Sequence, residues 1–286
     1  MFAKYAVMTM LIADGGSTKT EWALVEENNV RILVTEGINP VHMTAAEIET
    51  ILCREFTLSA GKIDVVRFYG AGCIPAKCSD VSDVLRKVFG TEDVTVESDL
   101  LGAARGLLGD GAGVIGILGT GSNSALYDGS EMVHHVPPLG YILGDEGSGA
   151  DLGKRLLGNI LKGLMPEDVT EAFYKAYPLE YTAILDSVYR SPGTNRFLAG
   201  FCPFLSNHID HPAVCAIVER AFSDFTERNL MQYAGIRELP VSFTGSVACY
   251  FEKPLRNVLK QYGLTAGKIE RTPMPGLIGY HQGKRN

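Results

Sequence analysis

A short polar turn between two apolar strands is the feature of this chain that most limits how it can fold. The run from Met10 to Ala13 predicts a buried strand, because it is short, apolar and closed by a turn signal. Gly15 and Gly16 predict a sharp reversal, since glycine reaches positive φ at little cost. Alternation after Thr20 then predicts a second strand. A Walker A loop and a dinucleotide-binding fingerprint are both excluded, because each of them opens a helix.

The turn has two interpretations. Its backbone N–H groups, the hydroxyls of Ser17 and Thr18 and the ammonium of Lys19 would bind an anion such as phosphate. Asp14 would repel a bare phosphate but suits a hydrated Mg²⁺. Asp and Gly are equally the residues of an ordinary β-turn. The turn alone leaves both interpretations open.

A second copy of the pattern favours the phosphate interpretation. The segment 114–129 is again an apolar strand, a Gly/Ser/Thr turn and a strand ending in Ala-Leu. Two such hairpins predict a duplicated domain whose hairpin tips face each other across a cleft. Two facing tips that are rich in hydrogen-bond donors can hold a polyphosphate from both sides.

Composition predicts a globular protein of two ordinary domains. The chain has 286 residues, of which 46% are hydrophobic and 21% charged, and a net charge of −7. No basic surface is predicted for nucleic acid or an anionic membrane, and no run is long enough to span a bilayer. The apolar start, residues 1–12, is interpreted as a brief tail rather than a signal sequence. The six scattered cysteines predict reduced thiols in the cytoplasm, not metal ligands.

The remaining pattern alternates strands and helices, and then becomes helical. Strands are predicted at residues 30–34, 65–69 and 94–98, and a capping box at Thr44–Glu47 begins a helix. Further helices are predicted at 81–89, 100–106 and 148–161, through most of 166–232, and at 274–281. Residues 240–248 predict a strand, a glycine turn and a helix start.

Three polar residues stand at turns or at the starts of helices. Asn39 precedes Pro40 and is a natural turn residue. Asp99 follows a strand and begins a helix, so it is either an N-cap or a group at the carboxyl end of a strand, where ligands collect in such folds. Asp145 precedes a helix, where a carboxylate is favoured by the helix dipole.

Three segments together resemble the BadF/BadG/BcrA/BcrD ATPase-type family, and most closely its N-acetylglucosamine kinase members. The segments are Asp14–Thr20, Leu118–Asn123 and Gly144–Ser148. The resemblance implies an α/β fold of two duplicated actin-like (ribonuclease H-like) domains, with a cleft between them and a helical insertion in the second. It implies an N-terminal domain of residues 1–110 joined by the C-terminal helix 275–286. The second domain would be residues 111–274, with the insertion at about 150–235.

The family assigns roles to the matching residues. The resemblance implies that Asp99 is the catalytic base, that Asn39 and Asp145 bind the sugar together with Thr120, and that Asp14 supports Mg²⁺, through water in one arrangement. ATP would be bound by a set of glycine, hydroxyl and charged residues: Asp14, Gly15, Gly16, Ser17, Thr18, Lys19, Gly119, Thr120, Gly121, Ser122, Gly245 and Ser246. The implied enzyme is an ATP- and Mg²⁺-dependent kinase for an amino sugar, above all N-acetylglucosamine.

Several points stay open from the sequence. Pro138–Tyr141 departs from the Gly-Trp-Gly type segment of those kinases, which leaves the sugar undetermined. The alternative function is an ATPase activator of the BadF type, which would need paired exposed cysteines, and Cys73 and Cys78 are the only close pair. A sugar sensor without turnover is a third reading. The oligomeric state is left open, with a homodimer as one option. We expect the two domains to close over ATP and sugar.

Overall fold

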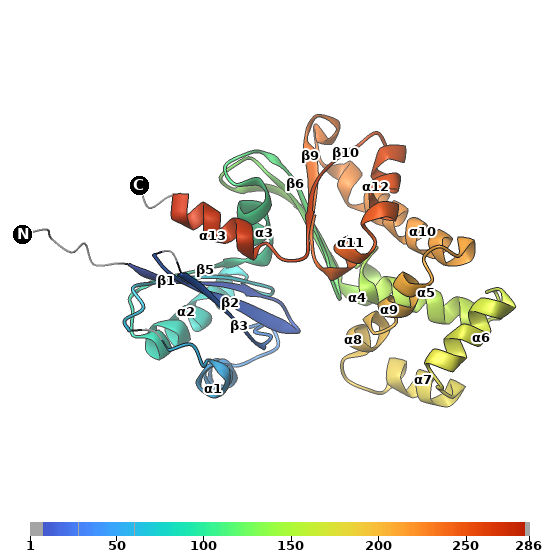
Figure 1. The fold of residues 1–286 in the computed structure, drawn as a ribbon, viewed down its shortest axis with the longest axis horizontal. Helices are drawn as coiled ribbons and strands as arrows, with labels where there is room; N and C mark the ends of the chain where they lie inside the picture. Colours follow the sequence, from blue (N-terminus) through green and yellow to red (C-terminus); the bar gives the residue numbers. More distant parts are fainter. Residues whose placement is uncertain (1–7, 28, 60, 284–286) are drawn as a thin grey trace, which may run out of the picture. The chain divides into compact units, whose positions relative to one another are not determined.

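The chain divides into two compact units in the computed structural model, which describes residues 8–27, 29–59 and 61–283. Unit 1 comprises residues 1–110 and 272–286, and unit 2 comprises residues 111–271. Figure 1 colours the chain by sequence, so that the last helix of unit 1 appears in red beside blue and cyan elements. Unit 1 is therefore completed by the C-terminal end of the chain.

Unit 1 is built on a five-stranded sheet of order β3-β2-β1-β4-β5. Its strands are β1 (Thr9–Gly15), β2 (Lys19–Glu26), β3 (Asn29–Glu36), β4 (Val65–Gly70) and β5 (Asp93–Ser98). The first three strands form an antiparallel meander, and β4 and β5 continue the sheet in parallel. The central strand β1 is buried on both faces, which explains its unbroken apolar run.

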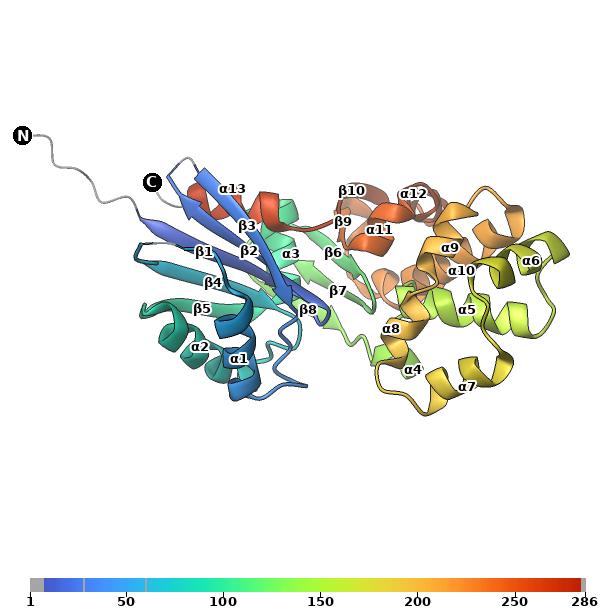
Figure 2. The same ribbon diagram turned by 60° about the horizontal axis from the view of Figure 1, so that its bottom comes forward.

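Helices cover both faces of this sheet. One face carries α1 (Ala45–Glu55) and α2 (Pro75–Phe89), whose apolar stripes pack on Trp22, Leu24 and Phe68. The other face carries α3 (Asp99–Leu108) and α13 (Met274–Gly283), with Met274 and Leu277 packed on β1 and β2. Figure 2 shows α1 and α2 on one side of the strands and α13 on the other. The predicted capping box at Thr44 is confirmed.

Unit 2 repeats the plan of unit 1. Its sheet has the order β10-β9-β6-β7-β8, which is the same order read from the opposite edge. The strands are β6 (Gly113–Leu118), β7 (Ser122–Tyr127), β8 (Met132–Val136), β9 (Pro240–Thr244) and β10 (Thr265–Glu270). Strands β6, β7 and β8 are antiparallel neighbours, whereas β9 and β10 run parallel to β6. The predicted duplication is confirmed.

Between β8 and β9 the chain of unit 2 is helical. The helices are α4 (Gly140–Leu143), α5 (Gly149–Leu161), α6 (Glu167–Ala176), α7 (Tyr181–Tyr189), α8 (Thr194–Ala199), α9 (Cys202–Asn207) and α10 (Pro212–Arg228), followed by the short 3₁₀ turns η1 (Leu230–Gln232) and η2 (Ile236–Glu238). After β9 come α11 (Ser246–Tyr250) and α12 (Glu252–Gln261). Residues from all these helices except α4, with β6 and β9, form one apolar core, so the helical segment is continuous with the sheet.

The α/β fold class predicted from the sequence is confirmed, but four elements were not predicted. The sequence analysis assigned no element to the segments that form α4, β8, α12 and β10. β8 pairs with the preceding strand β7 in a hairpin, but its two histidines hide the apolar alternation of a strand. The described residues contain no helix with the length and apolarity that crossing a membrane requires.

Candidate functional site

The β1–β2 turn of unit 1 is tight and presents polar side chains to solvent. Gly16 donates its N–H to the Lys19 carbonyl at 2.9 Å, and Ser17, Thr18 and Lys19 are exposed. The prediction that Gly15 and Gly16 adopt positive φ is wrong, since neither residue does so. A Cβ on Gly15 would lie 2.8 Å from the Phe68 ring, so close approach is what requires glycine here.

The Asp14 carboxylate, near the end of β1, is affected by the charges of two other carboxylates. Asp14 is the last residue but one of this strand and pairs in register with Glu21 of β2. Burial first, and then the charges of Asp99 and Glu21, raise the pKa of the Asp14 carboxyl to about 7, although Lys19 acts to lower it. Glu21 was missed by the sequence analysis, although antiparallel pairing places it directly opposite Asp14.

Asp99 opens α3 at the carboxyl end of β5. The interpretation of Asp99 as an N-cap is wrong: Ser98 is the N-cap, and its hydroxyl accepts the N–H of Leu101 at 3.2 Å. Asp99 is the first helical residue, and its Oδ1 accepts the N–H of Leu100 at 2.9 Å. Burial raises the pKa of the Asp99 carboxyl to about 6, against which backbone hydrogen bonds lower it. The capping role is therefore filled by the neighbouring Ser98.

Asn39 joins the turn to two neighbouring loops. Its Nδ2 donates to the Ser17 Oγ at 2.9 Å, and its Oδ1 accepts the N–H of Val41 at 3.0 Å. A Cβ on Gly72, whose φ is +77°, would lie 2.1 Å from the Asn39 Oδ1. Asn39 is thus a turn residue, as its sequence context indicates, and also a direct neighbour of the predicted phosphate turn. The proposed sugar contact stays a prediction.

The β6–β7 turn of unit 2 is held by the start of α5. Gly149 donates its N–H to the Gly119 carbonyl at 2.8 Å, and Ala150 donates to the Thr120 carbonyl at 3.1 Å. A Cβ on Gly121 would lie 3.0 Å from the Asp145 carboxylate, so a glycine is needed for the carboxylate to lie close to the turn. The hairpin tip and the segment before α5 are therefore built as one piece.

Asp145 is buried and conformationally unusual. Only 8% of it is exposed, its φ is 57°, and its Oδ1 accepts the N–H of Ser122 at 3.2 Å. Burial raises the pKa of its carboxyl, and the Ser122 hydrogen bond opposes that rise. The neighbouring Glu146 instead forms an ion pair with Arg228 at 2.6 Å. A non-glycine residue at positive φ is strained, and such strain is concentrated at functional sites.

Gly245 follows β9 and lies against the first hairpin strand of unit 2. Its φ is 116°, and a Cβ there would lie 2.2 Å from the Leu118 carbonyl oxygen. Ser246 then begins the short helix α11. Both residues therefore lie next to the end of β6, at the base of the β6–β7 turn. Their assignment to ATP stays a prediction.

The donor set of unit 1 fits a hydrated Mg²⁺. Mutual repulsion between the Asp14 and Asp99 carboxylates is relieved by a divalent cation, and Mg²⁺ usually keeps several waters and binds one or two carboxylates. Within the described residues no group of three or more His, Cys, Asp or Glu side chains could hold a metal ion by itself. Any Mg²⁺ bound here would therefore need water and phosphate oxygens as ligands besides the carboxylates.

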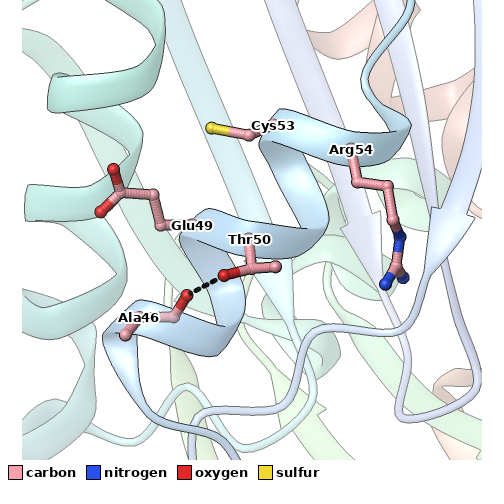
Figure 3. A pocket seen from close by; sticks show the side chains of 5 residues that line it. All are labelled: Ala46, Glu49, Thr50, Cys53 and Arg54. Atoms are coloured by element: carbon pink, nitrogen blue, oxygen red, sulfur yellow. Dashed lines mark hydrogen bonds between the residues drawn. The ribbon is translucent and has the colours of Figure 1, made fainter.

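The cysteine pair of the alternative function has a different environment. Cys73 is 5% exposed, and burial raises the pKa of its thiol to about 12. The Cys78 Sγ donates to the Ile74 carbonyl at 3.3 Å. A buried thiol with a raised pKa is a poor cluster ligand. A hollow of about 550 Å³ lies along one side of α1 and is lined by Ala46, Glu49, Thr50, Cys53 and Arg54, whose side chains are drawn in Figure 3. None of the predicted site residues lines it.

Known structures with the same architecture are sugar kinases and related proteins. A candidate N-acetylglucosamine kinase from Porphyromonas gingivalis is 47% identical, with 97% of this chain and 100% of that chain covered and a TM-score of 0.93. A candidate N-acetylglucosamine kinase from Chromobacterium violaceum is 20% identical, with 96% and 99% covered and a TM-score of 0.74. A glucokinase of the ROK family from Streptomyces griseus, in complex with glucose and AMPPNP, is 14% identical, with 96% and 98% covered and a TM-score of 0.57. Comparison with family models and with curated proteins gave no match.

The duplicated sheets and the two donor-rich hairpins define a two-domain protein of the actin-like class. The Chromobacterium violaceum and Streptomyces griseus structures share this fold. The Porphyromonas gingivalis protein shares nearly half of its residues with this chain over almost the whole length. The chain therefore belongs to the BadF/BadG/BcrA/BcrD ATPase-type family, among its N-acetylglucosamine kinase-like members.

Proposed function

We propose that this protein is an ATP-dependent kinase that phosphorylates a hydroxyl of an amino sugar, with N-acetylglucosamine as the substrate. The observation that carries the proposal is the 47% identity, over 97% of the chain, to the Porphyromonas gingivalis protein. The two donor-rich hairpins and the Asp14–Asp99 carboxylates supply the matching chemistry. The burial of Cys73 favours this function over the cluster-bearing activator.

The roles that we propose are those that the family resemblance implies for the matching residues. The β1–β2 turn binds phosphate through backbone N–H groups and through Ser17, Thr18 and Lys19. In the β6–β7 turn, Thr120 and Gly121 offer their N–H groups to phosphate. Gly119 and Ser122 shape this turn, because their N–H groups already donate to the Gly121 carbonyl and to the Asp145 carboxylate. Gly245 allows the adenosine to approach the backbone. Asp99 accepts the proton of the sugar hydroxyl as the hydroxyl oxygen attacks the γ-phosphorus of ATP, and ADP leaves as the bond between the γ-phosphorus and the β,γ-bridging oxygen breaks. Asn39, Thr120 and Asp145 orient the sugar by hydrogen bonds.

Mg²⁺ would be held by Asp14, directly or through water, and would neutralise phosphate charge. Asp99 can accept the proton of the sugar hydroxyl at neutral pH, because the Asp99 carboxyl, with its raised pKa of about 6, is still ionised there. A base whose pKa lies near the working pH transfers protons most effectively. We also place the protein in the cytoplasm, because its six cysteines are free and ATP is its substrate.

A coupled ADP-release assay tests the proposal. We expect ATP turnover with N-acetylglucosamine, weaker turnover with glucosamine or glucose, and little ADP without sugar. The acceptor series should include lactone derivatives of N-acetylmuramic acid, because the Pro138–Tyr141 segment departs from the family pattern. Sugar-independent ATP hydrolysis at an unchanged rate would contradict the kinase proposal and would favour the activator.

Asp145→Asn is expected to raise the sugar KM about tenfold or more and to leave ATP affinity unchanged. The amide keeps the shape and can still accept the Ser122 N–H, but the charge-assisted hydrogen bonds to the sugar, worth roughly 1.5–3 kcal/mol, are weakened. Initial-rate kinetics against each substrate measure the effect. Glu131→Gln removes an exposed carboxylate of the same unit and is the control. Equal loss of both affinities would indicate a folding defect instead.

The value of kcat/KM is expected to fall on the acid side with an apparent pKa near 6. The base must be a carboxylate, and Asp99 becomes protonated as the pH drops below about 6, so activity should fall roughly tenfold per pH unit there. Saturating Mg²⁺ lowers the pKa of Asp14, which leaves Asp99 to set this limb. A profile from pH 5 to pH 8 measures it, and a flat profile would argue against a carboxylate base.

A further inference from the structure

The edge strand β3 of unit 1 exposes a row of branched apolar side chains. Val30, Ile32 and Val34 are 40%, 50% and 51% exposed, and alternation places them on one face of the sheet. The same face is covered by α13 over β1 and β2, where Ala23 and Val25 are fully buried. Figure 2 shows β3 at the outer edge of its sheet. The apolar face therefore continues beyond the helix that covers its centre.

The backbone of the same residues faces outward. Gly37 donates its N–H to Thr18, toward the neighbouring strand, whereas Glu36 donates its N–H away from β2 to the Glu55 carboxylate. In an antiparallel strand, the backbone N–H and C=O groups of successive residues point alternately to the two sides of the strand. The backbone groups of Val34, Ile32 and Val30 therefore point away from β2, as those of Glu36 do. The stretch 30–34 thus combines outward N–H and C=O groups with exposed apolar side chains.

The equivalent strand of unit 2 shows that the fold does not require this surface. β8 occupies the same place at the edge of the duplicated sheet, yet it has five residues where β3 has eight. Beside Val133 it exposes His134 and His135. Short edge strands and polar side chains are the usual protection against edge-to-edge pairing, and a long apolar edge lacks both. β3 is therefore built to be paired.

We propose that β3 pairs antiparallel with β3 of a second copy of this chain about a twofold axis at Ile32. In this register Ile32 faces Ile32 of the partner subunit, and Val30 faces Val34 of the partner subunit, so every outward backbone group of the stretch meets a complementary one. This pairing stops at a dimer, because the β3 edges of both copies are then hydrogen-bonded to each other and no third copy can add to them. The two sheets of unit 1 become one continuous sheet.

The charges at this edge agree with a self-complementary pair. Arg31 is already neutralised by Glu26 at 2.9 Å, and in the proposed register it lies opposite Leu33 of the partner subunit. Glu36 lies beyond the paired stretch and is bound by Arg54 at 3.0 Å. No two like charges face each other between residues 30 and 34. A second copy therefore meets neither repulsion nor an unpaired charge at this strand.

Sedimentation velocity on the full chain tests the proposal. We expect a dimer at micromolar concentration, and we expect Ile32→Lys to raise the dimer dissociation constant by at least about 100-fold, because both copies lose the apolar contact. Val133→Lys makes the same change on the equivalent edge of unit 2, where the valine is 54% exposed, and should leave the dimer intact. The proposal would be overturned if the wild-type protein stayed monomeric at a concentration 100-fold above the micromolar range, or if Ile32→Lys left the dimer undisturbed.

Cysteine cross-linking tests the register without disturbing the fold. Ile32→Cys is expected to form a disulfide between subunits under mild oxidation, because the paired residues face each other across the axis. Val30→Cys places the thiol opposite Val34 of the partner subunit and should not cross-link, whereas the double variant Val30→Cys, Val34→Cys should. The wild-type protein gives the baseline, since Cys53 and Cys249 are exposed. Equal cross-linking of Val30→Cys and Ile32→Cys, or none at position 32, would rule out this register.

Discussion

Replacing Asp99 by asparagine is expected to lower turnover about 10²–10⁴-fold, which is the range of general-base contributions. The same substitution should make the folded protein more stable at pH 8. Burial raises the pKa of the Asp99 carboxyl from 3.8 to about 6, so its ionised form is disfavoured in the folded state. An asparagine of the same shape carries no charge to desolvate and can still accept the Leu100 N–H. Loss of activity with gain of stability would separate chemistry from folding.

The direction of the pH dependence follows from the raised pKa. Between pH 3.8 and pH 6 the folded state binds more protons at Asp99 than the unfolded state does, so wild-type stability falls as the pH rises through this window. Above pH 6 the full difference in the free energy of unfolding between Asp99→Asn and the wild type is expected. It should be about 1–3 kcal/mol, since one pKa unit corresponds to 1.36 kcal/mol and part of the shift is screened by solvent. Below pH 4 the variant and the wild type should converge.

Urea denaturation at pH 4 and pH 8, together with ATP titration, measures both effects. Nucleotide binding should be nearly unchanged in Asp99→Asn, because the base contacts the sugar hydroxyl and not ATP. Glu92→Gln removes a fully exposed carboxylate of the same unit and should change neither activity nor stability. Full turnover in Asp99→Asn would remove this residue from the mechanism.

Local sequence pattern predicted the elements around the site but not always the reason for each residue. The order strand, turn, strand at Asp14–Thr20 is confirmed, yet neither glycine has positive φ: Gly15 packs closely against Phe68, and Gly16 lies against the Lys19 carbonyl. Both causes leave the same residue in the sequence, so the pattern could not distinguish them. At the start of α3, adjacent Ser98 and Asp99 are both good caps, and only the backbone hydrogen bonds decide between them.

Contacts between distant segments could not be predicted from local pattern. The Ser122–Asp145 hydrogen bond and the link between Asn39 and Ser17 each join residues about 20 positions apart. Their partners are set by how the loops fold onto the sheet, and no periodicity records that. β8 was missed for a different, local reason, because its two exposed histidines break the apolar alternation of an edge strand.

Gly276→Ala is expected to destabilise unit 1 by about 1–3 kcal/mol or more, the usual cost of forcing extra atoms into a packed core. A Cβ on Gly276 would lie 1.7 Å from the Gly106 carbonyl oxygen and 2.6 Å from its carbon. These atoms belong to the backbone of α3, which cannot move aside as the end of a flexible side chain can. The added methyl must therefore push α13 away from α3. Amide hydrogen exchange should show α13 losing protection before the strands of the sheet do.

Gly279→Ala provides the matched control on the same helix. No heavy atom lies within 4 Å of a Cβ placed there, and the residue is exposed. Since alanine is favoured over glycine in a helix interior by about 0.8–1.0 kcal/mol, this variant should be slightly more stable than the wild type. The sequence spacing treats the two glycines alike, but only Gly276 lies at a helix crossing. Equal urea midpoints for the two variants would mean that α13 does not pack on α3 through Gly276.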